Sequence, residues 1–261
     1  MGRTIEIAHP PRRIISLVPS QTELLFHLGL DEEVVGITKF CIHPKEQFQR
    51  KPRIGGTKQF NMVKIADLQP DLIIGNLEEN EKEQMEHLFS RYPVWMSDIK
   101  TLEDALDMIE QIGFLVGKPK AAQNLRKQIK DQFLNLKQSL SLTIPKKRVA
   151  YFIWRKPYMV AASNTFIDKM LESAQFENVF HNMKRYPMVN KEDIQKSNPD
   201  VILLSSEPFP FTEKHFPELL EICPKAIIKV VDGEMFSWYG NRLLHAPAYF
   251  SNLHQLLDDK P

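Results

Sequence analysis

The sequence predicts an α/β protein with two Rossmann-like lobes joined by a single long helix. Three observations carry this prediction. Short apolar runs alternate with amphipathic segments, landmarks of the first half recur in the second, and one long amphipathic segment separates the halves. The predicted boundaries are residues 1–118 for the N-terminal lobe, 119–143 for the helix and 144–261 for the C-terminal lobe.

The first lobe opens with a strand, a helix and a second strand. The apolar run at 13–18 stops at Pro19, and Ser20 with Glu23 matches a helix capping box. Gly29 ends the predicted helix, and the apolar residues 34–37 then predict the next buried strand. This alternation indicates a largely parallel sheet.

The second half repeats the landmarks of the first. In both halves a helical segment, a Pro-Asp turn and an apolar strand follow one another. The matching landmarks are the Pro-Asp pairs at 70–71 and 199–200, the strand openings at Arg13 and Arg148, and the strand ends at Asp98 and Asp232, with offsets of 129, 135 and 134 residues. Three ordered matches at nearly one offset predict two similarly built halves.

A long helix is predicted between the halves. Apolar residues recur there at steps of four, four, three and four, which gives one narrow stripe. The stripe consists of Leu125, Ile129, Phe133, Leu136 and Leu140. Pro119 suits the first turn of such a helix, and about 22 helical residues reach roughly 33 Å. A coiled-coil seam is the competing interpretation, against which the lack of clear e/g charge pairing counts.

Composition excludes several classes of protein. The 261 residues hold 34 Lys and Arg against 33 Asp and Glu, so no electrostatic feature favours a nucleic acid partner. The longest apolar runs are far below the ~18 residues of a membrane span. Two cysteines make no disulfide framework. Residues 1–7 lack the apolar region of a secretory signal, which leaves two expectations: periplasm or cell envelope if a signal was removed, cytoplasm if the chain is native.

Several segments resemble the helical-backbone (class III, TroA-like, periplasmic binding protein 2) substrate-binding proteins of ABC importers. The resemblance rests on 2–7, on PRRIISLVPSQTE at 11–23, on DLQPDLII at 67–74 and on 198–204. It implies two α/β lobes with the ligand held in a cleft between them. A narrower resemblance, to a cobalamin-binding-like branch, rests on TKFCIHP at 38–44, GGTK at 55–58, NLEEN at 76–80 and FSWYG at 236–240.

The expected function follows from this resemblance. The chain is expected to be a monomeric binding protein that captures a metal chelate (corrinoid, haem or ferric siderophore) for an ABC permease, with no resident cofactor or metal. The sequence holds no nucleophile elbow, zincin, Walker or dinucleotide motif, so we do not expect an enzyme. The alternative is a cytoplasmic metal- or corrinoid-binding protein or sensor of the same fold, not coupled to transport.

Candidate ligand-binding residues follow from the rule that ligands bind beyond the carboxyl ends of parallel strands. Aromatic side chains are frequent there, and flat rings suit a macrocyclic ligand. The predicted ligand-binding residues are Phe40, Cys41, His43, Glu79, Arg155, Tyr158, Tyr186, Trp238 and Tyr239. By the resemblance, Phe40, Tyr158 and Tyr186 fall where cobalamin binders place pocket aromatics.

A metal site is the alternative interpretation of part of this set. Cys41 and His43 share one face of an extended segment, and Glu78 or Glu79 would complete a set of S, N and O ligands. His43 could instead coordinate the metal of a bound chelate. The plain structural interpretation makes Cys41 a small buried side chain and His43 a turn residue.

Charged residues suggest two further contacts. Carboxylates of a ligand could be met by Lys58, Arg155, Arg185 and Arg242, each of which is otherwise a surface charge. The resemblance implies that one exposed Glu per lobe docks on the permease. Glu192 matches the C-lobe position, whereas Val63 occupies the N-lobe position and carries no acid.

Overall fold

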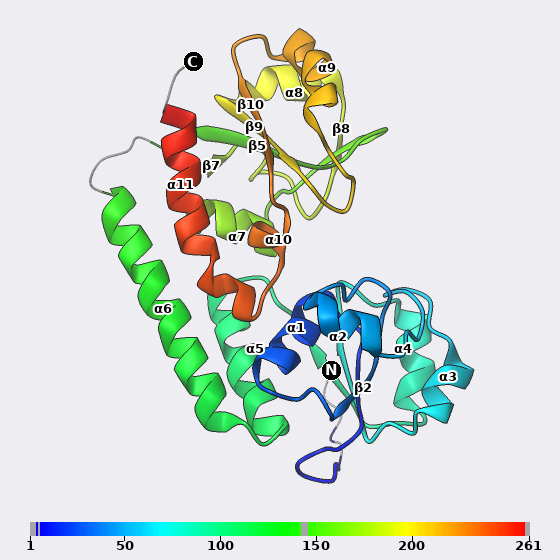
Figure 1. Cartoon of the computed structure of the whole chain (residues 1–261). Coiled ribbons are helices and arrows are strands. Elements are labelled where there is room, and N and C mark those ends of the chain that lie inside the picture. The colour runs from blue at the N-terminus through cyan, green and yellow to red at the C-terminus, as the bar shows by residue number, and fades with distance from the viewer. Residues whose placement is uncertain (1–3, 5, 142–145, 259–261) are drawn as a thin grey trace. The chain divides into compact units, whose positions relative to one another are not determined.

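The computed structural model describes Thr4, residues 6–141 and residues 146–258, and its packing divides the chain into two compact units (Figure 1). The first unit comprises the chain up to Ile99, Glu103–Gln128 and Tyr239–Arg242. The second comprises Lys100–Leu102, Ile129–Trp238 and the chain from Leu243. The predicted boundary between residues 143 and 144 lies outside the described residues. The predicted α/β class is confirmed in both units.

The first unit contains a four-stranded sheet in the order β2-β1-β3-β4, and every neighbouring pair is parallel. Its strands are β1 (Ile14–Ser16), β2 (Val34–Ile37), β3 (Leu72–Asn76) and β4 (Val94–Ser97). Its helices are α1 (Pro19–His27), α2 (Lys45–Arg50), α3 (Met62–Asp67), α4 (Lys82–Phe89) and, from its second residue on, α5 (Leu102–Leu115). The first two residues of a 3₁₀ turn at Asn241–Leu244 also belong to this unit. The strands β1, β2 and β3 are fully or largely buried, as their apolar runs predict, and β4 is half-buried.

The second unit contains a sheet in the order β10-β9-β5-β6-β8, with β7 paired to β5. Its strands are β5 (Arg148–Trp154), β6 (Tyr158–Val160), β7 (Glu177–Asn178), β8 (Met188–Val189), β9 (Val201–Ser205) and β10 (Ile227–Val231). Its helices are α7 (Phe166–Ser173), α8 (Lys191–Ser197), α9 (Phe216–Ile222), α10 (Glu234–Ser237) and α11 (Ala246–Asp258), with a 3₁₀ turn at Glu213–His215. β6 runs antiparallel to β5 and β8, which the sequence did not predict.

Successive side chains of the second sheet's strands point to opposite faces, so this sheet has a separate core on each face. Phe152 and Leu204 belong to one buried cluster with Ile194 of α8 and Leu219 of α9. The neighbouring residue Tyr151 faces the other way, where its ring lies 5.0 Å from that of Phe236 in α10. Figure 1 accordingly shows α8 and α9 on one side of this sheet and α7 and α10 on the other.

The repeated landmarks make equivalent hydrogen bonds in both halves. The Asp71 carboxylate accepts a hydrogen bond from the backbone N–H of Arg13 at 2.8 Å, and Asp200 accepts one from the backbone N–H of Arg148 at 2.8 Å. Each arginine side chain also donates to the end of the helix that precedes the Pro-Asp turn, Arg13 to the carbonyl of Leu68 and Arg148 to those of Ser197 and Asn198. The Pro-Asp turns therefore hold the start of the first strand of each sheet, which explains why these residues recur.

Helix α6 (Pro119–Ser141) begins at the predicted proline. The five residues of its predicted stripe are all buried, with exposed fractions of 7% or less. Residues up to Gln128 belong to the first unit and those from Ile129 to the second. Neither α6 nor any other helix that the structure describes is long and apolar enough to cross a membrane.

The predicted capping box at the start of α1 is wrong. The helix begins at Pro19, its N-cap is Val18, and no side chain caps it. Proline suits this position because the first helical N–H has no partner within the helix. Ser20 is buried within the first turn, and Glu23 instead forms an ion pair with Arg242.

Candidate functional site

Exposed apolar side chains gather at the carboxyl ends of strands in the first unit. Phe40 and Ile42 follow β2 and are 48% and 44% exposed, and Leu77 follows β3 and is 48% exposed. Gly56 leaves room for the Phe40 ring, because a Cβ there would lie 3.3 Å from its Cε2 atom. The Lys39 ammonium lies 5.0 Å from the centre of the same ring. This end of the sheet therefore offers an apolar surface with a cation at one side.

Cys41 does not lie on that surface. Its side chain is fully buried, and its Sγ lies 3.1 Å from the hydroxyl oxygens of Thr22 and Thr38. Burial raises the pKa of the Cys41 thiol. The structure does not support the predicted ligand contact, because a bound molecule could reach this sulfur only after the loop rearranged.

The predicted metal site is not supported either. Residues 38–42 turn back on themselves, since the N–H of Cys41 donates to the carbonyl of Thr38, so Cys41 and His43 do not share a strand face. His43 is half-buried. Within the part of the chain that the structure describes, no group of three His, Cys, Asp or Glu side chains could hold a metal ion.

The loop after β3 is held by two asparagines. The Asn76 side chain is buried, and its Oδ1 accepts from the N–H groups of Glu78 at 2.8 Å and Glu79 at 3.2 Å. Asn80 Oδ1 in turn accepts from the N–H of Asn76 at 2.9 Å. This Asx-type turn leaves Glu79 half-exposed at the end of the sheet.

A second aromatic surface lies at the carboxyl end of β5 in the second unit. Trp154 is 40% exposed and meets Phe209 edge to face at 5.7 Å. Tyr158, at the start of β6, packs edge to face on Phe152 at 5.5 Å. The hairpin between β5 and β6 thus places Trp154 and the predicted residue Tyr158 at one end of the sheet.

Arg155 and Tyr158 meet on one carboxylate, that of Glu218 in α9. Arg155 donates from Nε at 3.0 Å and from Nη2 at 2.6 Å to Oε2 of Glu218, and the Tyr158 hydroxyl donates to the other carboxylate oxygen. Burial raises the pKa of the Glu218 carboxyl, but the hydrogen bonds from Tyr158 and Arg155 outweigh it and lower that pKa overall. Glu218 is therefore ionised at neutral pH and neutralises Arg155.

Trp238 is held by a carboxylate as well. Its indole N–H donates to Glu207 Oε1 at 2.9 Å, and the Ser237 hydroxyl donates to the same oxygen at 2.7 Å. Burial raises the pKa of Glu207, and the nearby negative charges of Glu234 and Asp232 raise it further. Trp238 is only 7% exposed, so it can offer a ligand little of its ring surface. Its neighbour Tyr239 belongs to the first unit and is 6% exposed.

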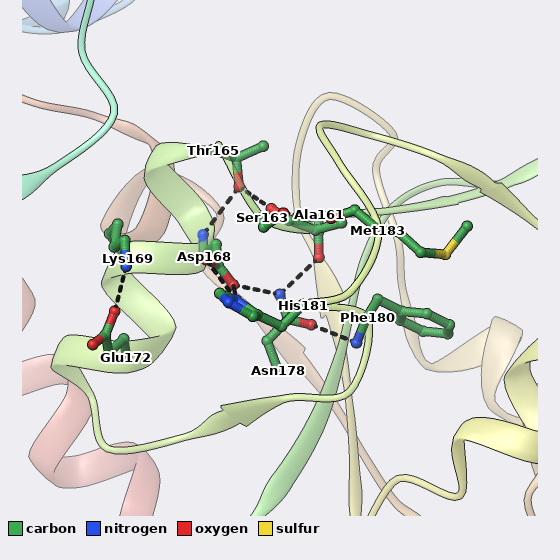
Figure 2. A network of polar contacts seen from close by, with 11 residues as sticks. Ala161, Ser163, Thr165, Asp168, Lys169, Glu172, Asn178, Phe180, His181 and Met183 are labelled. Atoms are coloured by element: carbon green, nitrogen blue, oxygen red, sulfur yellow. Dashed lines mark hydrogen bonds and ion pairs between the residues drawn. The ribbon is translucent and has the colours of Figure 1, made fainter.

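The loop that carries Tyr186 starts from a buried polar network. Asp168 of α7 is 3% exposed and accepts from Asn178 Nδ2 at 2.8 Å, and His181 Nδ1 lies 3.1 Å from its other oxygen (Figure 2). Farther along, Tyr186 is half-buried, and the Arg185 guanidinium lies 5.8 Å from its ring centre. The network fixes where the loop leaves β7.

Glu192 and Val63 occupy equivalent positions in the two units. Each is the second residue of a helix, and an asparagine side chain, Asn190 or Asn61, caps that helix. The Glu192 side chain is 80% exposed and Val63 is 71% exposed. Their placement agrees with the predicted docking positions, and the docking itself stays a prediction.

Comparison with known families shows to which family this chain belongs. The sequence model described as periplasmic binding protein matches residues 14–218. The chain belongs to the periplasmic binding protein family. The resemblance found in the sequence is thereby confirmed.

Relatives of this periplasmic binding protein agree in sequence and in fold. The vitamin B12-binding protein of Vibrio parahaemolyticus is 28% identical over 198 residues, which cover 75% of this chain and 71% of that protein. The periplasmic vitamin B12-binding protein BtuF of Vibrio cholerae matches with a TM-score of 0.82 at 20% identity, over 96% of this chain and 99% of that one. The periplasmic heme-binding protein RhuT from Roseiflexus sp. RS-1 has a TM-score of 0.82 at 21% identity, over 95% and 98%. The structural likenesses show the shared fold.

Sequence reasoning missed the acids that organise this periplasmic binding protein's strand ends. Glu218 lies 63 residues from Arg155, and Glu207 lies 31 residues from Trp238. No spacing signal connects such pairs. The carboxyl-end rule did select the loops that hold Ile42 and Leu77, but their exposure could be seen only in the structure.

Proposed function

We propose that this periplasmic binding protein captures a metal chelate, a corrinoid, haem or ferric siderophore, for ABC-type import. One observation carries the proposal. Large apolar side chains are exposed in the loops at the carboxyl ends of strands in each unit, with Phe40 and Leu77 in the first and Trp154 in the second. The names of the relatives, which bind vitamin B12 or heme, support this ligand class.

The physical argument concerns apolar area. A soluble protein gains nothing by exposing rings such as Phe40 and Trp154, and such patches mark binding surfaces. A flat macrocycle laid on such a ring removes the exposed ring face from water and costs little rotamer entropy. The proposed role is binding and delivery, without a catalytic step.

Delivery requires a permease, and Glu192 is the proposed docking residue of the second unit. Its carboxylate stands at the exposed first turn of α8. Val63 replaces the expected acid in the first unit, so docking there would be apolar. Glu192→Gln should weaken capture by the cognate permease in vesicles without changing ligand affinity, and unchanged capture would contradict this assignment.

The ligand proposal is tested by titrating cobalamin, haem and ferric siderophores while following tryptophan fluorescence. Phe40→Ala and Trp154→Ala should each reduce the binding free energy of the ligand that binds by about 1 to 2 kcal/mol. Phe114→Ala is the matched control, because Phe114 is 69% exposed but lies in α5, away from the strand-end loops. If no chelate binds, or if the control loses as much affinity, the proposal is wrong.

A further inference from the structure

Two of the arginines predicted to meet a ligand carboxylate, Arg155 and Arg242, are already neutralised by the protein itself. In the second unit, Arg155 gives two hydrogen bonds to Glu218, whose remaining oxygen accepts from Tyr158. In the first unit, Arg242 forms a two-pronged ion pair with Glu23, at 3.0 and 2.7 Å. A guanidinium whose charge is already compensated by a carboxylate is a poor partner for a ligand carboxylate.

The remaining charge of the second unit's strand ends is negative on balance. Glu207 follows β9, and Asp232 and Glu234 follow β10, whereas Lys156 after β5 is the one cation beside Arg155 in these loops, which the structure describes in full. Asp232 and Glu234 lie near enough to Glu207 to oppose its ionisation. A carboxylate brought to this edge of the sheet would be repelled, whereas an amide N–H would find acceptors.

The first unit offers no compensating excess of positive charge. The loops after β2 carry Lys39, Lys51, Arg53 and Lys58, and the loop after β3 carries Glu78, Glu79 and Glu81. Lys51 is paired with Asp31 at 3.6 Å, which leaves three cations against three acids. The Lys39 ammonium is also placed beside the Phe40 ring. An acidic ligand would therefore gain little at this edge of the first unit.

We infer that the ligand of this site is a chelate whose rim bears amides or other uncharged groups, not carboxylates, and that Glu218 is a specificity-determining residue which enforces this choice by neutralising Arg155. The inference rests on the proposed function and narrows it. Among the chelates proposed, it favours amide-bearing corrinoids and uncharged siderophores over a porphyrin with two free propionates. Glu218 acts on the ligand through Arg155.

The test compares ligands that differ only in carboxylates. One pair is cyanocobalamin and its derivative in which one peripheral amide is hydrolysed to the acid. The other pair is haem and its dimethyl ester. Dissociation constants are measured by tryptophan quenching on wild-type protein, on Glu218→Gln and on the control Glu221→Gln, which makes the same charge change at an exposed position of the same helix.

The neutral member of whichever pair binds should be favoured by about tenfold in the wild type and in Glu221→Gln. Glu218→Gln frees Arg155 and should shrink that ratio to about threefold or less, mainly by tightening the acid. Equal or tighter binding of the acid by the wild type overturns the inference, and an unchanged ratio in Glu218→Gln removes Glu218 as the determinant. If no member of either pair binds, the inference is overturned; if no siderophore binds either, the proposed function fails as well, which is a distinguishable result.

Discussion

The ion pair between Glu23 and Arg242 should be among the strongest single contributions to the stability of the first unit. Both side chains are only 13% exposed, and both guanidinium prongs are used. Removing one partner of a buried pair costs about 3 to 5 kcal/mol, because the other charge is left without compensation. The residual exposure reduces this, so we expect Glu23→Gln to lower the free energy of unfolding by about 2 to 4 kcal/mol.

This loss should be visible as a fall of roughly 4 to 16 °C in the melting midpoint, at about 2 to 4 °C per kcal/mol for a chain of this size. Arg242→Gln should do the same, and the double variant should be less destabilised than the sum of the two singles. Glu86→Gln is the control, since its pair with Lys82 is exposed and spans 3.9 Å. A shift for Glu23→Gln no larger than that of the control would refute the reasoning.

Three further predictions concern burial. In a Cys223→Ser protein, the remaining Cys41 thiol, whose pKa is raised by burial, should react with a disulfide reagent only as the protein unfolds; prompt reaction in native buffer would contradict its placement. Ile129→Ala should cost about 2 to 5 kcal/mol in urea unfolding, and Leu134→Ala, 49% exposed on the same helix, under about 1 kcal/mol; equal costs would refute the packing of α6. The raised pKa of Glu207 means that its ionisation opposes folding, so Glu207→Gln should be more stable than wild type at pH 7. The difference in unfolding free energy between the two proteins should shrink as the pH falls through the raised pKa toward the ordinary 4.5. A difference that grows on acidification would contradict a raised pKa for Glu207.

Much of the fold was predictable because its signals are local. The apolar runs that became β1, β2, β3 and β9 are short and nearly continuous, as buried parallel strands require. The stripe of α6 was predicted residue by residue and is buried throughout. The antiparallel β6 escaped prediction, because three residues after a hairpin leave too short a pattern to identify.

The candidate site was less predictable. Phe40 was expected to face a ligand and is exposed, whereas Cys41, its neighbour, is fully buried. An extended segment would place Cys41 and His43 on one face, where they could share a ligand. The turn closed by the hydrogen bond from the Cys41 N–H to the Thr38 carbonyl excludes that arrangement. One-residue differences in loop conformation are set by tertiary hydrogen bonds, which the residue types alone do not specify.

The amino-acid sequence by itself determined that two similar α/β halves form, since each half carries the apolar strands, the Pro-Asp turn and the arginine that the turn holds. Only the tertiary structure decided which charged side chains pair with one another. Arg155 meets Glu218 across 63 residues, and Arg242 meets Glu23 across 219. Periodicity and capping act over a few residues of chain, whereas an ion pair depends on the distance between two atoms, and that distance exists only once the sheets and helices have packed.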